Sequence, residues 1–282
     1  MKTVFGVLGG DKRQLYLARS VLKDGFLCFV SGMEKLPEAA GLPSLPPKEL
    51  AEKCDVIILP LPATLDGKTL NAPYSSEVIV LDDEFVSVLE NKLVYGGMVS
   101  RLIQSSELWS RIALEDYWLR EDFALLNSIP TAEGAVALAV TNYPAMLCGA
   151  KCLVTGWGRI GSILARLLRA MGAKVFVAER KSEKRAMARS IGCEALTFDE
   201  INKPFDIIFN TVPGKVIGRD VLMTQSKSCL VIELASKPGG IDREAAQNMG
   251  IKLIDGSSLP GRFSPKSAGE FIKEAVYNML EE

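Results

Sequence analysis

The sequence predicts an α/β fold with two doubly wound parallel-sheet domains joined by a connecting helix. The chain has 282 residues, and a domain of roughly 150 residues is ordinary, so this length accommodates two domains. Short apolar segments alternate with helical stretches, which is typical of a parallel sheet covered by helices on both faces. The alternation stops near residue 128 and restarts at Lys151, which indicates two α/β units in tandem.

The first predicted domain covers residues 1–128. An apolar strand over 4–8 leads into the turn Gly9-Gly10-Asp11, and a helix with one apolar face follows. Proline-rich stretches between the later elements are predicted to be loops. The remaining predicted elements are strands over 26–30, over 56–59 and ending at 94–95, and a short helix over 49–53.

A connecting helix is predicted over residues 129–147. Thr131 stands two residues before Glu133, and Pro130 precedes a run of Ala, Val and Leu, a combination typical of a helix start. The second domain is then predicted over residues 148–266. Its elements are strands over 152–155, 174–178, 206–210, 229–234 and 252–254, and helices over 159–171 and 182–191.

The last segment, residues 267–282, is predicted to be a helix with no strand after it. It is therefore free to pack back onto the first domain. We expect the two domains to face each other across a cleft.

Composition excludes several classes of function. Lys plus Arg number 33 and Asp plus Glu number 34, so the net charge is −1, without the basic excess that nucleic-acid or anionic-membrane binding needs. Histidine is absent, so no mechanism can use an imidazole base. We expect neither a nucleic-acid nor a membrane partner.

The cysteines and the apolar runs indicate a cytoplasmic protein without a metal. The six cysteines form no C-x-x-C pair, which fits reduced, buried thiols. The apolar run over 3–10 has no small-residue cleavage site, so a strand is favoured over a secretion signal. The longest uncharged run, 134–150, contains Asn142 and Pro144 and is shorter than the ~20 apolar residues that a membrane helix needs.

The strongest functional signal is a glycine-rich segment between the strand over 152–155 and the next helix. In this setting, G-x-G-x-x-G predicts a dinucleotide-binding Rossmann domain. The first glycine allows the tight turn, the second lets a diphosphate approach the backbone, and the third lets the helix lie close to the sheet. The helix N-terminus then binds the phosphates. The predicted coenzyme-binding residues of this segment are Gly156, Trp157, Gly158, Arg159, Ile160 and Gly161.

Residues after the next strand leave the choice of coenzyme open. Glu179 stands 18 residues after Gly161, close to the position where an acidic side chain accepts hydrogen bonds from the ribose of NAD. Arg180 and Lys181 are suited instead to the 2′-phosphate of NADP. The local sequence therefore allows either coenzyme.

Loops that follow other predicted strands are expected to complete the site. Ligands of an open parallel sheet bind outside the carboxyl ends of its strands, so two of these loops should line the nicotinamide. A third loop, 259–266, offers two cations and a hydroxyl to an anionic substrate, and Arg13 at a helix start suits a substrate carboxylate. The residues predicted near the nicotinamide are Thr211, Val212, Pro213 and Ala235.

Several longer segments of the chain carry a resemblance to a known family: GGDKRQ at 9–14, ILPLPAT at 58–64, LNSIPTAEGAVALAV at 126–140, ELASKPGG at 233–240 and LPGRFSPKSAG at 259–269. With them the chain resembles the A subunits of dipicolinate synthase, the enzyme of spore-forming bacteria that oxidises dihydrodipicolinate to pyridine-2,6-dicarboxylate. Several of these segments are specific to that family, whereas the glycine fingerprint is not. More distantly, the layout is similar to D-2-hydroxyacid dehydrogenases and adenosylhomocysteine hydrolase, where a connecting helix joins a flavodoxin-like substrate domain to the nucleotide domain.

The resemblance implies NADP as the oxidant, a role in sporulation, and a dicarboxylate substrate from a branch of the lysine (diaminopimelate) pathway. It also implies that the partner is a flavoprotein-like B subunit, while a homo-oligomer stays open. Glu179 departs from the small residue expected in an NADP-binding member, so NAD remains the alternative. Oxidising a dihydropyridine ring suits a chain without histidine, because hydride leaves a ring carbon and positioning is the main task.

Candidate substrate residues follow from the charges and hydroxyls near these loops. Cations would grip the two carboxylates, and hydroxyls would donate further hydrogen bonds. Either Asp11 or Glu133 would accept the ring proton if its pKa is raised, or else serve as a helix cap. An alternative hypothesis is a non-catalytic nucleotide-binding subunit whose partner holds the chemistry. The predicted substrate-binding residues are Asp11, Arg13, Thr131, Glu133, Lys237, Arg262 and Ser264.

Overall fold

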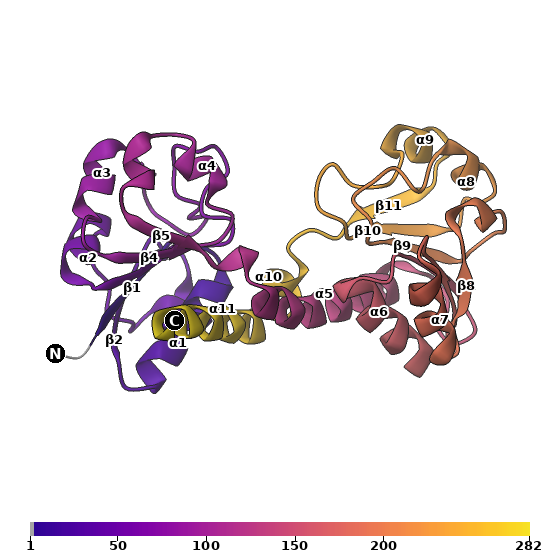
Figure 1. Ribbon diagram of the computed structural model, residues 1–282, viewed down its shortest axis with the longest axis horizontal. Helices are drawn as coiled ribbons and strands as arrows, with labels where there is room; N and C mark the ends of the chain where they lie inside the picture. Colours follow the sequence, from indigo (N-terminus) through magenta and orange to yellow (C-terminus); the bar gives the residue numbers. More distant parts are fainter. Residues whose placement is uncertain (1–2) are drawn as a thin grey trace. The chain divides into compact units, whose positions relative to one another are not determined.

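The computed structural model describes residues 3–282 and divides them into two compact units (Figure 1). The N-terminal unit consists of residues 3–127 and Ser264–Glu282, and the second unit is Ser128–Phe263. Each unit is built around one all-parallel sheet. The predicted fold class of two parallel-sheet α/β domains is confirmed.

The sheet of the N-terminal unit has the strand order β2-β1-β3-β4-β5, which is the flavodoxin-like order. Its last strand was not predicted, because the sequence Ala-Leu-Glu-Asp has no apolar run. The strands are β1 (Val4–Leu8), β2 (Leu27–Ser31), β3 (Val56–Ile58), β4 (Leu93–Gly96) and β5 (Ala113–Asp116). The helices are α1 (Lys12–Lys23), α2 (Pro47–Lys53), α3 (Asp83–Val88), α4 (Ser100–Ile103) and α11 (Pro265–Glu281), with the 3₁₀ turns η1 (Pro37–Ala39), η2 (Glu107–Ser110) and η3 (Tyr117–Leu119).

Helix α11, at the end of the chain, lies along α1 within the N-terminal unit (Figure 1). The two backbones approach so closely that a Cβ atom on Gly269 would lie 2.4 Å from the carbonyl oxygen of Arg13. Polar contacts border this seam: Lys273 Nζ donates to Asp24 Oδ2 at 2.7 Å, and Ser20 Oγ donates to Glu270 Oε2 at 2.7 Å. The chain therefore returns to its first domain after completing the second.

Helix α5 (Glu121–Asn142) begins in the N-terminal unit and ends in the second one. The helix differs from the predicted bounds of 129–147 at both ends: Pro130 lies inside it, and the acidic first turn, Glu121 and Asp122, marks its beginning. Pro144 stands shortly after its end, as expected of a residue that disfavours helix before it. By length and composition α5 could cross a membrane, but half of its most apolar window is buried within the protein.

The second unit has a six-stranded sheet of order β11-β10-β9-β6-β7-β8, which is the Rossmann order. The short strand β8 was not predicted. The strands are β6 (Lys151–Thr155), β7 (Lys174–Ala178), β8 (Glu194–Leu196), β9 (Ile207–Asn210), β10 (Leu230–Glu233) and β11 (Lys252–Asp255). The helices are α6 (Arg159–Ala170), α7 (Ser182–Ser190), α8 (Arg219–Met223), α9 (Arg243–Asn248) and α10 (Leu259–Phe263), with the 3₁₀ turn η4 (Phe198–Glu200).

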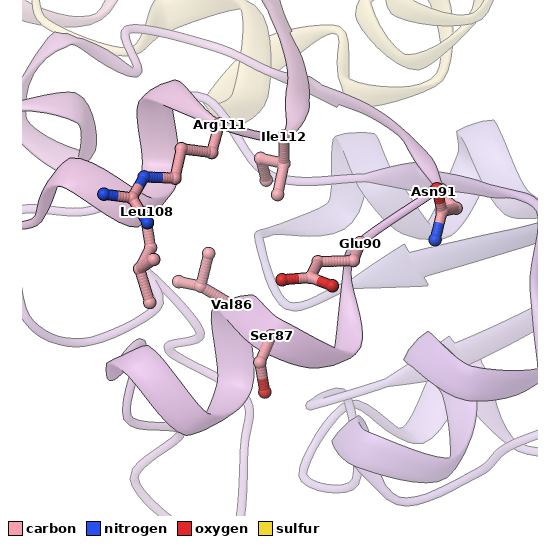
Figure 2. Close-up of a pocket in the computed structure, with 7 residues that line it drawn as sticks. All are labelled: Val86, Ser87, Glu90, Asn91, Leu108, Arg111 and Ile112. Atoms are coloured by element: carbon pink, nitrogen blue, oxygen red, sulfur yellow. The ribbon is translucent and has the colours of Figure 1, made fainter.

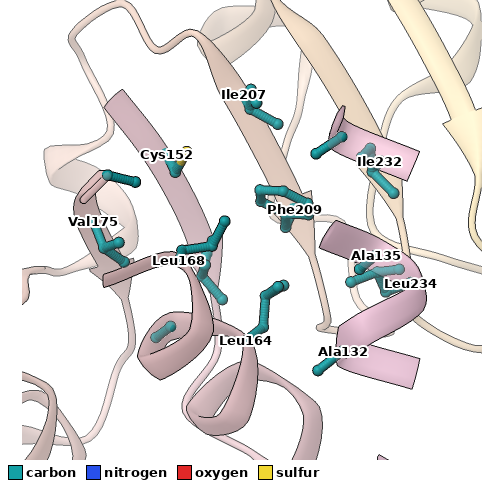
Figure 3. Packing of buried hydrophobic residues seen from close by; sticks show 14 of the residues in the cluster. Ala132, Ala135, Cys152, Leu164, Leu168, Val175, Ile207, Phe209, Ile232 and Leu234 are labelled. Carbon is teal, nitrogen blue, oxygen red and sulfur yellow. The ribbon is translucent and has the colours of Figure 1, made fainter. Parts of the chain in front are cut away.

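The C-terminal half of α5 and helix α6 cover one face of this sheet. Figure 3 shows Ala132 and Ala135 of α5 and Leu164 of α6 packed toward Phe209 of β9. The apolar residues of α6 recur at the spacing of one helix face, so burying that face fixes the start of the helix at the carboxyl edge of the sheet.

Candidate functional site

The glycine loop, Gly156 to Gly161, joins β6 to α6. Gly156 has a φ of +83°, a conformation that favours glycine. A Cβ atom on Gly161 would lie 2.2 Å from the carbonyl oxygen of Gly156, so the helix start and the turn touch through their backbones. A Cβ atom on Gly158 would meet nothing within 4 Å among the described residues. The loop is therefore closed on the side of the sheet and open at the N-terminus of α6.

Trp157 lies within the loop, but its side chain turns inward. It is 7% exposed and belongs to the core beneath α5 and α6. The Arg166 guanidinium lies 5.7 Å from the centre of its ring. Its indole is thus placed to report changes in the loop by fluorescence.

Glu179 follows β7 and is bound to the glycine loop. Its Oε2 accepts a hydrogen bond from the Trp157 N–H at 2.9 Å, and its Oε1 accepts one from the Lys181 N–H at 3.1 Å. Burial would raise the pKa of the Glu179 carboxyl, but these N–H groups outweigh burial and hold that pKa below its ordinary value. The side chain is therefore an ionised brace between the glycine loop and the turn after β7.

The basic residues after β7 have different roles. Arg180 and Lys181 are exposed at the start of α7. Arg185 is held in place, because its Nη1 donates to the carbonyl oxygens of Glu179 at 2.8 Å and Arg180 at 2.6 Å. Arg185 therefore holds the backbone of the turn after β7, while the side chains of Arg180 and Lys181 remain exposed on its surface.

The loops after β9 and β10 meet over a row of buried polar side chains, Thr155, Asn210 and Glu233, whose contacts sequence reasoning did not identify. Thr211 Oγ1 donates to the Thr155 carbonyl at 2.6 Å, and the Ala235 N–H donates to Glu233 Oε1 at 3.1 Å. The sequence does contain an indication that Glu233 has a special role, because this acidic residue ends an otherwise apolar strand just before a loop with two glycines. Of the other residues predicted beside the nicotinamide, Val212 is half-buried and Pro213 is exposed.

Two of the predicted substrate residues, Asp11 and Arg13, form an ion pair in the N-terminal unit. Asp11 caps α1 and accepts from Arg13 Nε and Nη2, both at 2.9 Å. Arg13 is 6% exposed, and its Nη2 also donates to the Leu61 carbonyl at 2.6 Å. The pair thus ties the start of α1 to the loop after β3. Ser264, also in this unit, immediately precedes α11.

The other predicted substrate residues belong to the second unit. Thr131 is buried on α5, whereas Glu133 on the same helix is exposed. Lys237 is exposed in the loop after β10. Arg262 is exposed on α10, which contacts α5 beside Gly134.

A separate hollow of about 230 Å³ opens on the N-terminal unit beside α3 and η2 (Figure 2). Among the described residues, its lining includes none of the predicted site residues, so the glycine loop remains the stronger candidate. The hollow is lined by Val86, Ser87, Glu90, Asn91, Leu108, Arg111 and Ile112.

Fold and loop together define a two-domain α/β protein with an NAD-binding, dehydrogenase-type domain. Residues 137–235 match the NAD-binding domain of the D-isomer specific 2-hydroxyacid dehydrogenases, and residues 4–113 match the N-terminal domain of the dipicolinate synthase A subunit. Over 98% of its length the chain is 30% identical to the A subunit of dipicolinate synthase from Bacillus subtilis (strain 168), covering 95% of that protein. The chain belongs to the A-subunit family of dipicolinate synthase.

Solved structures share this architecture. The A subunit of dipicolinate synthase from Bacillus halodurans matches with a TM-score of 0.88 and 32% identity, over 100% of this chain and 99% of that one. Its counterpart in the Bacillus subtilis dipicolinate synthase matches with a TM-score of 0.85 and 29% identity, over 100% and 96%. A transhydrogenase from Sinorhizobium meliloti, at 18% identity and a TM-score of 0.71 over 98% and 93%, shares the fold.

Gly161→Ala is expected to destabilise the second unit. The added Cβ would lie 2.2 Å from the Gly156 carbonyl oxygen, and overpacking of this kind costs about 1–3 kcal/mol. Urea denaturation followed by circular dichroism should show a lower midpoint. Gly158→Ala is the matched control, because its Cβ enters open space on extended backbone, and its midpoint should stay near that of the wild type. Equal midpoints for the two variants would contradict the tight contact.

Glu179→Gln is expected to lower the free energy of unfolding at neutral pH by about 1.5 kcal/mol, the scale of a hydrogen bond to a charged group. A carboxyl whose folded pKa is depressed contributes stability that is full above its unfolded pKa of about 4.3 and is lost as pH falls through the folded pKa. The difference from wild type should therefore shrink below about pH 4. Urea denaturation at neutral and acidic pH measures it, with the exposed Glu183→Gln as control. A pH-independent difference would count against the ionised brace.

Proposed function

We propose that this chain catalyses the NADP-dependent oxidation of dihydrodipicolinate, or of its hydrated precursor, to dipicolinate. It would act in the cytoplasm as the A subunit of dipicolinate synthase, beside a flavoprotein-like B subunit. The observation that carries the proposal is the 30% identity to a dipicolinate synthase A subunit over 98% of the chain, together with a glycine loop open at the start of α6.

The residues of the loop fit a dinucleotide. The open space at Gly158 and the N-terminus of the 12-residue helix α6 suit a diphosphate, because backbone N–H groups and the helix dipole favour an anion there. Bound NADP⁺ would supply the hydride acceptor, so that dihydrodipicolinate and NADP⁺ give dipicolinate, NADPH and H⁺. Thr211, Pro213 and Ala235 would border the nicotinamide, since they follow the carboxyl ends of β9 and β10.

The protein would mainly position the substrate. The exposed cations Lys237 and Arg262 suit the two substrate carboxylates. Arg13 already pairs with Asp11, so it would have to bind a substrate carboxylate in addition to that side chain. The hydroxyls of Thr131 and Ser264 would donate further hydrogen bonds. Because the chain has no histidine, Asp11 or Glu133 would accept the ring proton.

NADP is favoured over NAD by the way in which Glu179 is engaged. Both of its oxygens accept hydrogen bonds from backbone N–H groups of the glycine loop and the turn after β7. Its carboxylate is therefore satisfied without a ribose. Arg180 and Lys181, exposed on the same turn, then suit a 2′-phosphate.

A second candidate function is a non-catalytic nucleotide-binding subunit whose partner carries the chemistry. The absence of histidine favours it, as does the engagement of Asp11 in capping α1 and pairing with Arg13. In this case the second unit would bind a dinucleotide and regulate or dock the partner.

The activity is tested on purified chain supplied with NADP⁺ and enzymatically generated dihydrodipicolinate. We expect NADPH and dipicolinate to form in equal amounts, and Gly158→Ala, which fills the open space without disturbing the fold, to lose most of this activity. The assay is repeated in the presence of the B subunit. If the folded chain binds NADP⁺ but dipicolinate forms only when the B subunit is present, and without an equal amount of NADPH, the non-catalytic alternative holds.

Arg180→Ala is expected to weaken NADP⁺ binding about tenfold, the effect of losing one charge-assisted contact, and to leave NAD⁺ binding unchanged. Dissociation constants for both coenzymes can be measured by calorimetry or from the fluorescence of Trp157. Arg189→Ala, an exposed change in the last turn of α7, is the control and should affect neither constant. An equal loss for both coenzymes would argue against a 2′-phosphate contact.

A further inference from the structure

Three neighbouring strands of the second sheet end on a row of buried polar side chains. Thr155, Asn210 and Glu233 are the last residues of β6, β9 and β10, and the sheet register places Asn210 opposite each of the other two. All three are at most 2% exposed. A polar row at this depth is stable only if its members satisfy one another.

Hydrogen bonds run along this row. Thr155 Oγ1 donates to Asn210 Oδ1 at 2.5 Å, and Asn210 Nδ2 donates to Glu233 Oε1 at 2.6 Å. The row therefore runs along the carboxyl edge of the sheet from β6, which precedes the glycine loop, to β10, which precedes residues 235–240.

The same side chains hold the loops that follow the strands. Asn210 Nδ2 donates to the Val212 carbonyl at 2.9 Å, which fixes the loop after β9. Glu233 fixes the loop after β10 at both ends, because its Oε1 accepts from the Ala235 N–H at 3.1 Å and its Oε2 from the Gly240 N–H at 2.8 Å. One carboxylate thus closes residues 235–240 into a loop and ties that loop to Asn210.

The chemistry of the row requires a carboxylate at position 233. Its three partners, Asn210 Nδ2 and the N–H groups of Ala235 and Gly240, are all donors, and the two oxygens of a carboxylate provide the acceptors that serve them. An amide would place an NH₂ group against one of these donors.

Two glycines let the loop close over this carboxylate. A Cβ atom on Gly239 would lie 2.8 Å from Glu233 Oε2, and one on Gly240 would lie 2.4 Å from the Val212 carbonyl oxygen. Because both positions are glycine, the two loops can approach Glu233 this closely.

We propose that Glu233 is a positioning residue that holds the loops after β9 and β10 in the shape that receives the nicotinamide half of the coenzyme. This inference rests on the proposed function. Glu233 itself is 2% exposed and acts through the loops without touching the coenzyme. The diphosphate is received elsewhere, at the glycine loop, so the two halves of a dinucleotide should depend on Glu233 to different extents.

The test compares Glu233→Gln with wild type by calorimetry, using NADP⁺ and NAD⁺ and their fragments without nicotinamide, 2′-phospho-ADP-ribose and ADP-ribose. We expect the variant to bind the intact coenzyme about tenfold more weakly, the scale of one hydrogen bond to a charged group, and to bind the fragment as the wild type does. A merely structural role would weaken both alike, and that result, or no loss for either, would overturn the inference.

Asp255→Asn is the matched control, because Asp255 is the register partner of Glu233 at the end of β11 but lies exposed. It should leave both affinities unchanged. If the wild type binds neither coenzyme, the proposed function fails; if it binds them and Glu233→Gln shows no selective loss, only this inference fails.

A measurement on the wild-type protein tests the inference even if the Glu233→Gln variant does not fold. Hydrogen exchange in the absence of coenzyme should show the amides of Ala235 and Gly240 protected, since both donate to Glu233. Rapid exchange at these two amides would overturn the inference, because the loop would then not be held before the coenzyme binds.

Discussion

The backbones at Gly156 and Gly161 lie so close together that a Cβ atom on the second glycine would be 2.2 Å from the carbonyl oxygen of the first. This contact fixes the start of α6 against the end of β6. It also places the N–H groups of the first helical turn at the carboxyl edge of the sheet, where the Rossmann order puts a dinucleotide. Glu179 reinforces it from the neighbouring strand by accepting the Trp157 N–H. The proposals on coenzyme binding all depend on this arrangement.

Buried polar residues complete the same edge of the sheet. Ionisable groups in a protein interior are costly unless hydrogen bonds satisfy them, so a carboxylate such as Glu233 implies a structure arranged around it. Here three N–H donors converge on that carboxylate. The loops after β9 and β10 are consequently fixed by interactions within the protein, and a ligand that they receive need not order them.

The N-terminal unit uses its charges differently. Asp11 and Arg13 pair at the start of α1, and Arg13 reaches the Leu61 carbonyl in the loop after β3. Helix α11 then covers α1, so the end of the chain completes the core of the first domain. The chain therefore leaves the first unit along α5 and returns to it at Ser264, just before α11.

Local patterns along the chain are enough to predict the α/β class, the two sheets and the dinucleotide fingerprint. These follow from local patterns: short apolar runs form buried strands, and glycines at fixed spacing permit a turn that other residues cannot make. Features that depend on residues distant in the sequence are visible only in the folded structure. The start of α5 is one such feature: Pro130 and Thr131 locally resemble a helix start, but the helix begins at Glu121 and continues through both residues. Likewise, Arg13, Glu179 and Glu233 each have a partner near in sequence and another from a distant segment. The distant partners are Leu61, Trp157 and Asn210, and local patterns do not predict them.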